Sequence, residues 1–142
     1  MAINVYINFN GNCLKAVEFY SQVFETEKPK IMTYGDTPPN SGFIIPEDAK
    51  NLVMHALINI NGNNIMFSDT FPGSPFIIGD NISLVINSKN MDEIKSLFNK
   101  LKDGGVVDQD LQESFFSKCY GSLTDKFGII WQLSYDNGET GM

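Results

Sequence analysis

Apolar and polar residues alternate at the start of the chain, and then the period changes. Residues 3–10 alternate with a period of two, which predicts a strand with one apolar face and one polar face. Gly11 interrupts the alternation, and Asn12 is a favourable N-cap for a following helix. Residues 14–24 place apolar side chains at helical spacing. The start of the chain therefore predicts a strand–turn–helix unit.

The same pattern recurs in the second half of the chain. Residues 82–87 alternate as a strand would, and residues 90–102 have the spacing of an amphipathic helix. Asn90 and Glu93 have the spacing of a capping box, and Gly104-Gly105 is a typical C-terminal stop. The pattern, rather than residue identity, indicates two copies of one module.

Further predicted strands complete each copy. A short strand is expected at 30–34, and residues 51–61 alternate up to Asn61-Gly62-Asn63, a strong hairpin signal that leads into a strand at 64–69. In the second half, residues 106–107 are apolar, and the polar residues 108–113 lead to residues 114–118. A strand is expected at 119–124, a turn at 125–128 and a last strand at 129–135. Each half therefore reads strand–helix–strand–strand–strand, over residues 1–69 and 81–135.

A sheet with a single helix on one face leaves its other face open. Two such modules can meet by their open faces and enclose a cleft. The alternation predicts the side chains that would line it: Tyr6, Asn8, His55, Leu57, Met66, Ser68, Ser83, Val85, Ile130 and Gln132. Two long connections, 35–51 and 70–80, are expected to form either a lid or a dimer contact.

Charge and composition narrow the class of ligand and partner. The formal net charge is −7, and all ten basic residues are lysines. A protein without a clustered basic face or arginine is not expected to bind nucleic acid. A strongly anionic ligand is also disfavoured, because the bidentate guanidinium is missing.

The chain is expected to be a single domain of 142 residues in the cytoplasm. No apolar run approaches the roughly 20 residues that cross a bilayer, so no membrane association is expected. No signal peptide is evident, and two cysteines without framework spacing fit a reducing compartment.

Three segments carry a resemblance to a known superfamily. They are YINFNGNCLKAVEFYSQVF (6–24), MHALININGNNIMFSD (54–69) and YGSLTDKFGIIWQL (120–133). They resemble the vicinal-oxygen-chelate superfamily of glyoxalase I, extradiol dioxygenases and bleomycin- or fosfomycin-resistance proteins, and most closely its PhnB-like branch, named for a demethylubiquinone methyltransferase domain. Glu25 departs from that branch, which usually has Gly after the helix.

The resemblance implies an α+β fold of paired βαβββ modules, a cup-shaped half-barrel and a homodimer. Superfamily enzymes hold a divalent metal with His or Glu at four strand positions. The resemblance implies that the four ligand positions correspond in this chain to Val5 or Tyr6, Met66 or Ser68, Asn81 or Ser83, and Gln132. None of these residues is a usual ligand of zinc, iron or manganese, and the chain has one histidine. No metal cofactor is therefore expected; the alternative is a divalent metal held by unconventional ligands.

Individual candidates carry a functional and a structural reading. His55 is the best single candidate for acid–base chemistry or ligand binding, and Asp69 could orient it or cap a turn. Cys13 lies in the first turn of a helix, where the dipole can lower a thiol pKa, but a buried structural role is favoured for it. Tyr120 joins Gln132 as a candidate polar contact, whereas Trp131 is expected in the core.

These observations predict a protein that binds a small, partly apolar molecule in its cup without a catalytic metal. A metal-dependent lyase, isomerase or dioxygenase using unconventional ligands, such as His55 with Asp69 or residues from both subunits, is one alternative. An antibiotic-sequestering protein and a purely interaction-based role are the others.

Overall fold

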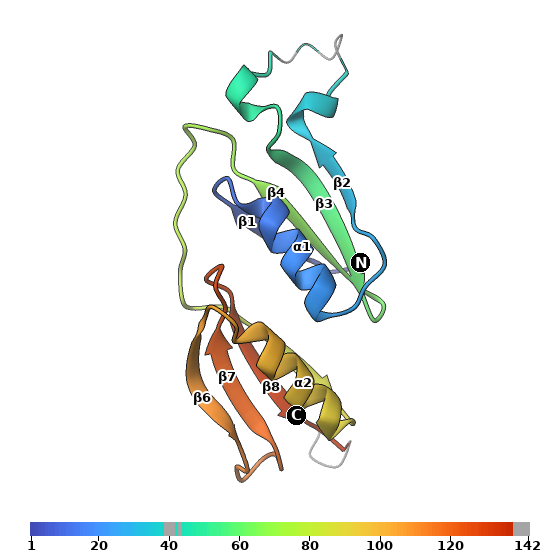
Figure 1. Cartoon of the computed structure of the whole chain (residues 1–142), viewed down its shortest axis with the longest axis vertical. Helices are drawn as coiled ribbons and strands as arrows, with labels where there is room; N and C mark the ends of the chain where they lie inside the picture. Colours follow the sequence, from blue (N-terminus) through green and yellow to red (C-terminus); the bar gives the residue numbers. More distant parts are fainter. Residues whose placement is uncertain (39–41, 43, 138–142) are drawn as a thin grey trace. The chain divides into compact units, whose positions relative to one another are not determined.

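The computed structural model describes residues 1–38, 42 and 44–137. The chain divides into two compact units, Met1–Ile77 and Ile78–Met142. In the described residues each unit contains one four-stranded sheet and one α-helix (Figure 1). Neither helix has the length and apolar character needed to cross a membrane. The fold class is α+β, as predicted, with two mixed sheets.

The first unit follows the order strand, helix, strand, strand, strand. Its elements are β1 (Val5–Phe9), α1 (Cys13–Val23), β2 (Lys30–Thr33), the short 3₁₀ helices η1 (Tyr34–Asp36) and η2 (Glu47–Ala49), β3 (Val53–Ile60) and β4 (Asn63–Asp69). The sheet order is β1-β4-β3-β2, with β1 parallel to β4 and the other pairs antiparallel. Asn61 and Gly62 form the predicted hairpin turn between β3 and β4, both with positive φ.

The second unit repeats this connectivity. Its elements are β5 (Ser83–Ser88), α2 (Met91–Leu101), β6 (Val106–Gln112), β7 (Tyr120–Thr124) and β8 (Ile130–Tyr135). The sheet order is β5-β8-β7-β6, with β5 parallel to β8. Each element takes the place of its counterpart in the first sheet. The inference of two copies of one module is confirmed.

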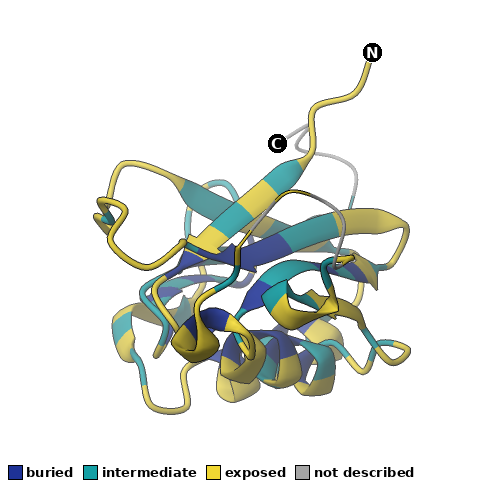
Figure 2. Ribbon diagram, turned by 90° about the horizontal axis from the view of Figure 1, so that it is seen from above, coloured by how far each residue is buried: buried dark blue, intermediate teal, exposed yellow. Residues whose placement is uncertain are grey.

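Each helix buries its apolar stripe against one face of its own sheet. Helix α1 packs on β3 and β4, where the Tyr20 ring stacks on the Phe67 ring at 5.9 Å between centroids. Helix α2 packs on β5 and β8, and its buried residues are Ile94, Phe98 and Leu101. Figure 2 shows this division, with buried stretches of the strands beside helices whose outer surfaces are exposed. Within residues 1–38, 42 and 44–137, neither α-helix packs on the opposite face of its own sheet.

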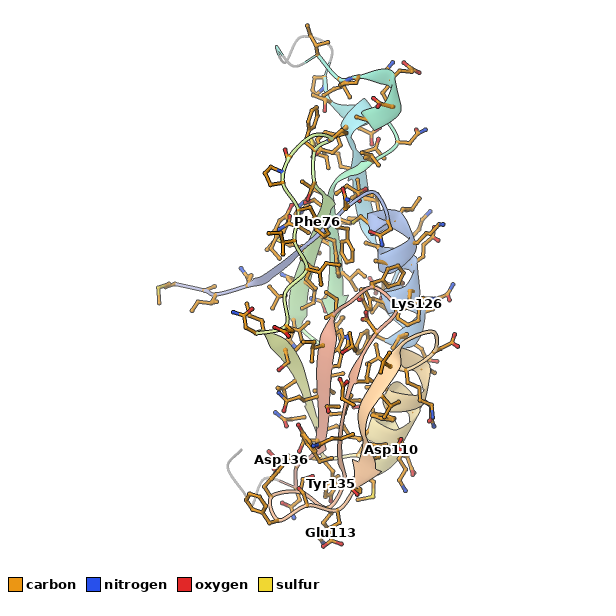
Figure 3. The ribbon with its side chains drawn as sticks, turned by 90° about the vertical axis from the view of Figure 1, so that its left-hand side faces the viewer. Phe76, Asp110, Glu113, Lys126, Tyr135 and Asp136 are labelled. Atoms are coloured by element: carbon orange, nitrogen blue, oxygen red, sulfur yellow. The ribbon has the colours of Figure 1, made fainter. Side chains whose placement is uncertain are left out.

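Strand β6 extends further than the apolar pattern indicates. The apolar pair Val106-Val107 indicates a strand start, yet the strand continues through polar residues 108–110 and Leu111 to Gln112. β6 is the edge strand of its sheet, and several of its side chains are exposed. Figure 3 labels Asp110, which lies on β6, and Glu113, which follows its last residue. Charged side chains are typical of an edge strand, because they discourage pairing with another chain.

The predicted capping box of α2 forms only in part. The Asn90 side chain accepts a hydrogen bond from the Glu93 backbone N–H at 3.1 Å, as predicted. The Glu93 carboxylate, however, accepts from the Ser88 hydroxyl at 2.9 Å, and the Asn90 backbone N–H donates to that hydroxyl oxygen at 3.0 Å. The Ser88 hydroxyl therefore bridges the Glu93 carboxylate and the Asn90 backbone N–H, which bond directly to each other in a complete capping box.

Candidate functional site

The candidate site in the first unit is the face of its sheet opposite α1, which we call the first open face. The register aligns Tyr6 and Leu57 with Met66, on either side of β4. It likewise aligns Asn8 with Ser68. All these side chains belong to the predicted set, and together with His55 they share one face of the sheet. Their role in binding a ligand stays a prediction.

Strand β2 adds two side chains that the sequence analysis missed. Lys30 pairs with Leu57, and Met32 pairs with His55, so both extend the first open face. The Met32 side chain is 47% exposed. The pattern did not reveal them because β2 has four residues and its register shifts between Met32 and Thr33.

Two polar contacts connect the strands of the first open face. The Tyr6 hydroxyl lies 3.5 Å from His55 Nδ1, and the two rings are 5.9 Å apart between centroids. The Ser68 hydroxyl donates to Asn8 Oδ1 at 3.2 Å. Tyr6 is 45% exposed and Asn8 is also exposed, so both remain accessible. The structure therefore groups the candidates into a Tyr6–His55 pair and an Asn8–Ser68 pair.

Asp69 has a structural role in this unit. Its carboxylate accepts hydrogen bonds from the backbone N–H groups of Gly11 at 2.8 Å, Cys13 at 3.0 Å and Val53 at 2.9 Å. The residue is 2% exposed. The side chain lies on the α1 side of the sheet, with Phe67, because neighbouring residues of a strand alternate between faces. The hydrogen bonds of Asp69 therefore favour its structural reading as a capping residue, and among the described residues the structure shows no hydrogen bond between Asp69 and His55.

Asp69 also replaces the predicted cap of α1. Asn12 occupies the N-cap position, but its side chain makes no capping hydrogen bond. The free N–H of Cys13 is satisfied instead by the carboxylate from the end of β4. A negative charge at this position also interacts favourably with the helix dipole.

Cys13 is an inert core residue rather than a nucleophile. Its side chain is fully buried. Burial, and secondarily the negative charge of Asp69, raise the pKa of the Cys13 thiol from 9.0 to about 12. The structural reading of Cys13 is confirmed. Cys119 is also buried and free.

The second unit carries a hydrogen-bonded chain on the face opposite α2, which we call the second open face. The Tyr120 hydroxyl donates to Gln132 Oε1 at 2.7 Å, and Gln132 Nε2 donates to Ser83 Oγ at 2.7 Å. These residues lie on β7, β8 and β5, so the chain crosses three strands. The Phe116 ring packs edge-on against Tyr120 at 4.9 Å between centroids. Three predicted site residues are thereby held together, and Val85 and Ile130 share their face.

Trp131 lies in the core, as predicted, and is 6% exposed. Its indole Nε1–H donates to Asp125 Oδ2 at 2.8 Å. The other carboxylate oxygen of Asp125 accepts from the backbone N–H groups of Phe127 and Ile129, which fixes the predicted turn before β8. The turn and the tryptophan thus support β8 from the side opposite Gln132.

Comparison with known proteins identifies the family. The model of the 3-demethylubiquinone-9 3-methyltransferase family matches residues 1–134. The chain belongs to this family. Protein YjdN of Escherichia coli K12 is 29% identical to this family member over 143 residues, covering 94% of the chain and 95% of YjdN.

Solved structures agree with this assignment. Protein PA1353 of Pseudomonas aeruginosa is similar with a TM-score of 0.84 and 31% identity, covering 96% of this chain and 98% of that one. A PhnB protein of Bacillus cereus, described as a putative 3-demethylubiquinone-9 3-methyltransferase, has a TM-score of 0.76 and 27% identity, covering 96% of this chain and all of that one. The fosfomycin resistance protein FosX of Listeria monocytogenes has a TM-score of 0.67 at 10% identity over the whole chain and 98% of that chain, and shows the shared glyoxalase/bleomycin-resistance fold.

The side chains at the four carried-over positions do not fit the divalent metal ion that enzymes of the superfamily bind. Among the described residues, no three His, Cys, Asp or Glu side chains lie close enough to hold a metal. Both ends of the Gln132 amide are already hydrogen-bonded within the second open face. Hydroxyl, thioether and amide groups at the other carried-over positions are weak substitutes for imidazole and carboxylate. The metal-free site stays a prediction.

Proposed function

We propose that the protein binds a small, partly apolar molecule, without a catalytic metal, in the half-barrel cup that its superfamily's fold implies. The first open face and the second open face are each candidate binding surfaces. The observation that carries the proposal is the composition of the first open face. There Leu57, Met32 and Met66 lie among the hydrogen-bonding groups of Asn8 and His55.

A surface of this kind suits a ligand with an apolar body and a few polar atoms. Small-molecule sites are mostly apolar, with a small number of polar groups that fix the ligand's orientation. Methionine side chains are flexible and polarizable, so they adapt to the shape of an apolar ligand. On the second open face the Tyr120–Gln132–Ser83 chain holds its polar groups in fixed positions.

The proposal includes a cytoplasmic homodimer. Several large apolar side chains of the described residues are exposed in or near the two long connections: Ile44 at 94%, Phe71 at 39%, Ile77 at 89% and Ile78 at 60%. Exposed apolar side chains are expected at a subunit contact or under a lid. Residues 39–41 and 43 of the first connection lie outside the described residues. Light scattering after gel filtration tests the dimer directly.

A thermal-shift screen against metabolites and antibiotics tests the proposal. Binding to the folded state raises stability by RT ln(1 + [L]/Kd), about 2.7 kcal/mol at 100 times Kd. The screen is run on protein purified without chelators and again after chelation, with elemental analysis of both. The proposal expects a ligand that raises Tm equally in both samples. A ligand whose effect disappears with a stoichiometric metal would contradict the proposal and favour the metal-dependent enzyme.

Two further measurements separate the remaining alternatives for any ligand found. Tight stoichiometric binding of an antibiotic without turnover would indicate sequestration. A His55→Ala variant with unchanged binding and turnover would remove His55 from the site. Failure of every small molecule to raise Tm would contradict the proposal and leave an interaction-based role.

A further inference from the structure

Gln132 lies among uncharged strand residues on the second open face. None of the residues of β5, β7 and β8 has a charged side chain, although the formal net charge of the protein is −7. Charged residues of this sheet lie on the edge strand β6, where the Asp108 carboxylate accepts from the Thr124 hydroxyl at 3.2 Å. β6 is two strands away from β8. A ligand group at Gln132 would therefore meet neutral strand residues, which favours a neutral group.

Each end of the Gln132 amide has one hydrogen-bond partner. Oε1 accepts from the Tyr120 hydroxyl at 2.7 Å, and Nε2 donates to Ser83 Oγ at 2.7 Å. Within residues 1–38, 42 and 44–137 the Gln132 side chain makes no further hydrogen bond. A primary amide has two N–H donors, and its oxygen has two acceptor lone pairs. One N–H and one lone pair of Gln132 therefore remain for a ligand.

The same groups remain free if the oxygen and nitrogen ends of the amide exchange places. The hydroxyl groups of Ser83 and Tyr120 can each donate or accept a hydrogen bond. In either orientation the amide nitrogen has one partner and the amide oxygen has the other. The free donor and the free acceptor therefore follow from the two distances alone.

The two hydrogen bonds hold the amide across the strands. Ser83 lies on β5 and Tyr120 on β7, the two neighbours of β8 in the sheet. Because the serine side chain is short, its oxygen lies close to the sheet and accepts from the N–H of Gln132 that is directed back towards the backbone. The other N–H lies on the carbonyl side of the nitrogen. The free N–H and the free lone pair are thus side by side, on the edge of the amide that is directed away from the sheet.

From these contacts we propose that the second open face recognises a cis-amide group, such as a primary carboxamide or a lactam. The carbonyl oxygen of the ligand would accept from Gln132 Nε2, and its N–H would donate to Gln132 Oε1, which closes a ring of two hydrogen bonds. Val85 is paired with Gln132 and is 53% exposed, so it offers apolar surface beside the amide. The inference rests on the proposed function, because it concerns one of the two candidate binding surfaces, and it names the polar group of the ligand.

Three probes of nearly the same shape test this inference on the native protein. Benzamide carries a cis-amide, acetophenone has a methyl group in place of the amide nitrogen, and benzamidine has a second nitrogen in place of the oxygen. We expect benzamide to bind about fivefold or more tightly than either of the others in NMR titrations at neutral pH, because each of them loses one of the two hydrogen bonds. Equal affinities, or tighter binding of acetophenone or benzamidine, would overturn the inference.

A Gln132→Glu substitution should change which probe is preferred. It keeps the shape of the side chain and the acceptor for Tyr120, and the Ser83 hydroxyl can donate to the second carboxylate oxygen. The free edge then has two acceptors in place of a donor and an acceptor. We expect the variant to bind benzamidine about tenfold more tightly than benzamide, because the amidinium donates charge-assisted hydrogen bonds to both oxygens. An unchanged preference for benzamide would contradict the inference.

Gln22→Glu is the matched control for this variant. It makes the same substitution, with the same change in net charge, at an exposed position of α1 in the first unit. Benzamide should remain the tightest of the three probes. A reversal of preference in both variants would mean that net charge, rather than the Gln132 amide, decides the order, and it would overturn the inference.

The side-chain amide signal of Gln132 shows where the probe binds. It is identified in the NMR spectrum by its absence from Gln132→Glu, and benzamide should shift it to saturation. Saturation without a shift of this signal, or no binding of benzamide, would overturn the inference. Neither result would remove the proposed function, which the thermal-shift screen decides by itself.

Discussion

Glu25 ends helix α1 in the left-handed region, with a φ of 50°. Its backbone N–H donates to the Gln22 carbonyl, and the Thr26 N–H donates to the Ser21 carbonyl, the pair of bonds of a Schellman motif. Left-handed backbone costs a residue with a Cβ about 1–2 kcal/mol. The resemblance places Gly at this position in the PhnB-like branch, and the geometry gives the physical reason.

Glu25→Gly should therefore stabilise the protein. We expect a gain of about 1 kcal/mol in the free energy of unfolding, measured by urea denaturation, since glycine relieves the left-handed strain but loses more entropy on folding. Glu18→Gly, at an exposed position inside the same helix, should lose about 1 kcal/mol. A loss of stability in both variants would contradict this account of the helix end.

Cys13 makes a prediction about alkaline pH. Burial raises the pKa of its thiol in the folded protein to about 12, whereas the unfolded chain ionises near 9.0. Above pH 9 the unfolded state therefore loses this proton first, and the stability contribution of the neutral thiol is lost as the pH rises. Between pH 8 and 11, the free energy of unfolding should fall more steeply in the native protein than in Cys13→Ala. Identical slopes would contradict the raised pKa.

Side-chain roles at this scale were predictable where they depend on local pattern. Trp131, on the alternate face from Gln132, was correctly expected in the core. The role of Asp69 was not, because its three partners, Gly11, Cys13 and Val53, lie far away in the sequence. No local spacing records such a contact.

At the scale of elements, the two helices begin in different ways although both have Asn at the N-cap. Asn90 caps α2 with its own side chain, whereas α1 takes its cap from Asp69. We expect Asn90→Ala to lower the free energy of unfolding by about 1 kcal/mol and Asn12→Ala to change it little, as measured by urea denaturation. Equal losses in the two variants would mean that Asp69 does not replace the cap of Asn12.

Strands were predictable from the sequence when their apolar and polar residues alternate and they are half-buried. The edge strands of the two sheets were less predictable. β1 and β3 show clear alternation, and their ends were predicted to within two residues or so. The polar part of β6 and the contribution of β2 to the first open face were not apparent. An edge strand is partly solvated, so it needs little apolar patterning, and its register depends on the neighbouring strand.

At the scale of the whole molecule, the duplicated βαβββ module accounts for the two open faces, because each α-helix packs on the other face of its own sheet. Each face groups polar residues that come from different strands, such as Tyr6 with His55 and Tyr120 with Gln132. Alternation in the sequence predicted that these side chains share a face. It could not give their hydrogen bonds, because those depend on strand register and side-chain direction.

The central claim is that a small, partly apolar molecule binds to the open sheet faces without a metal. Methionine methyl NMR tests it most directly, because Met32 and Met66 lie on the first open face, whereas Met91 lies on α2. Chelated protein is titrated with a ligand from the thermal-shift screen. We predict that the methyl signals of Met32 and Met66 shift to saturation while that of Met91 does not. Shifts of Met91 without Met32 and Met66, or shifts that require an added divalent ion, would contradict the claim.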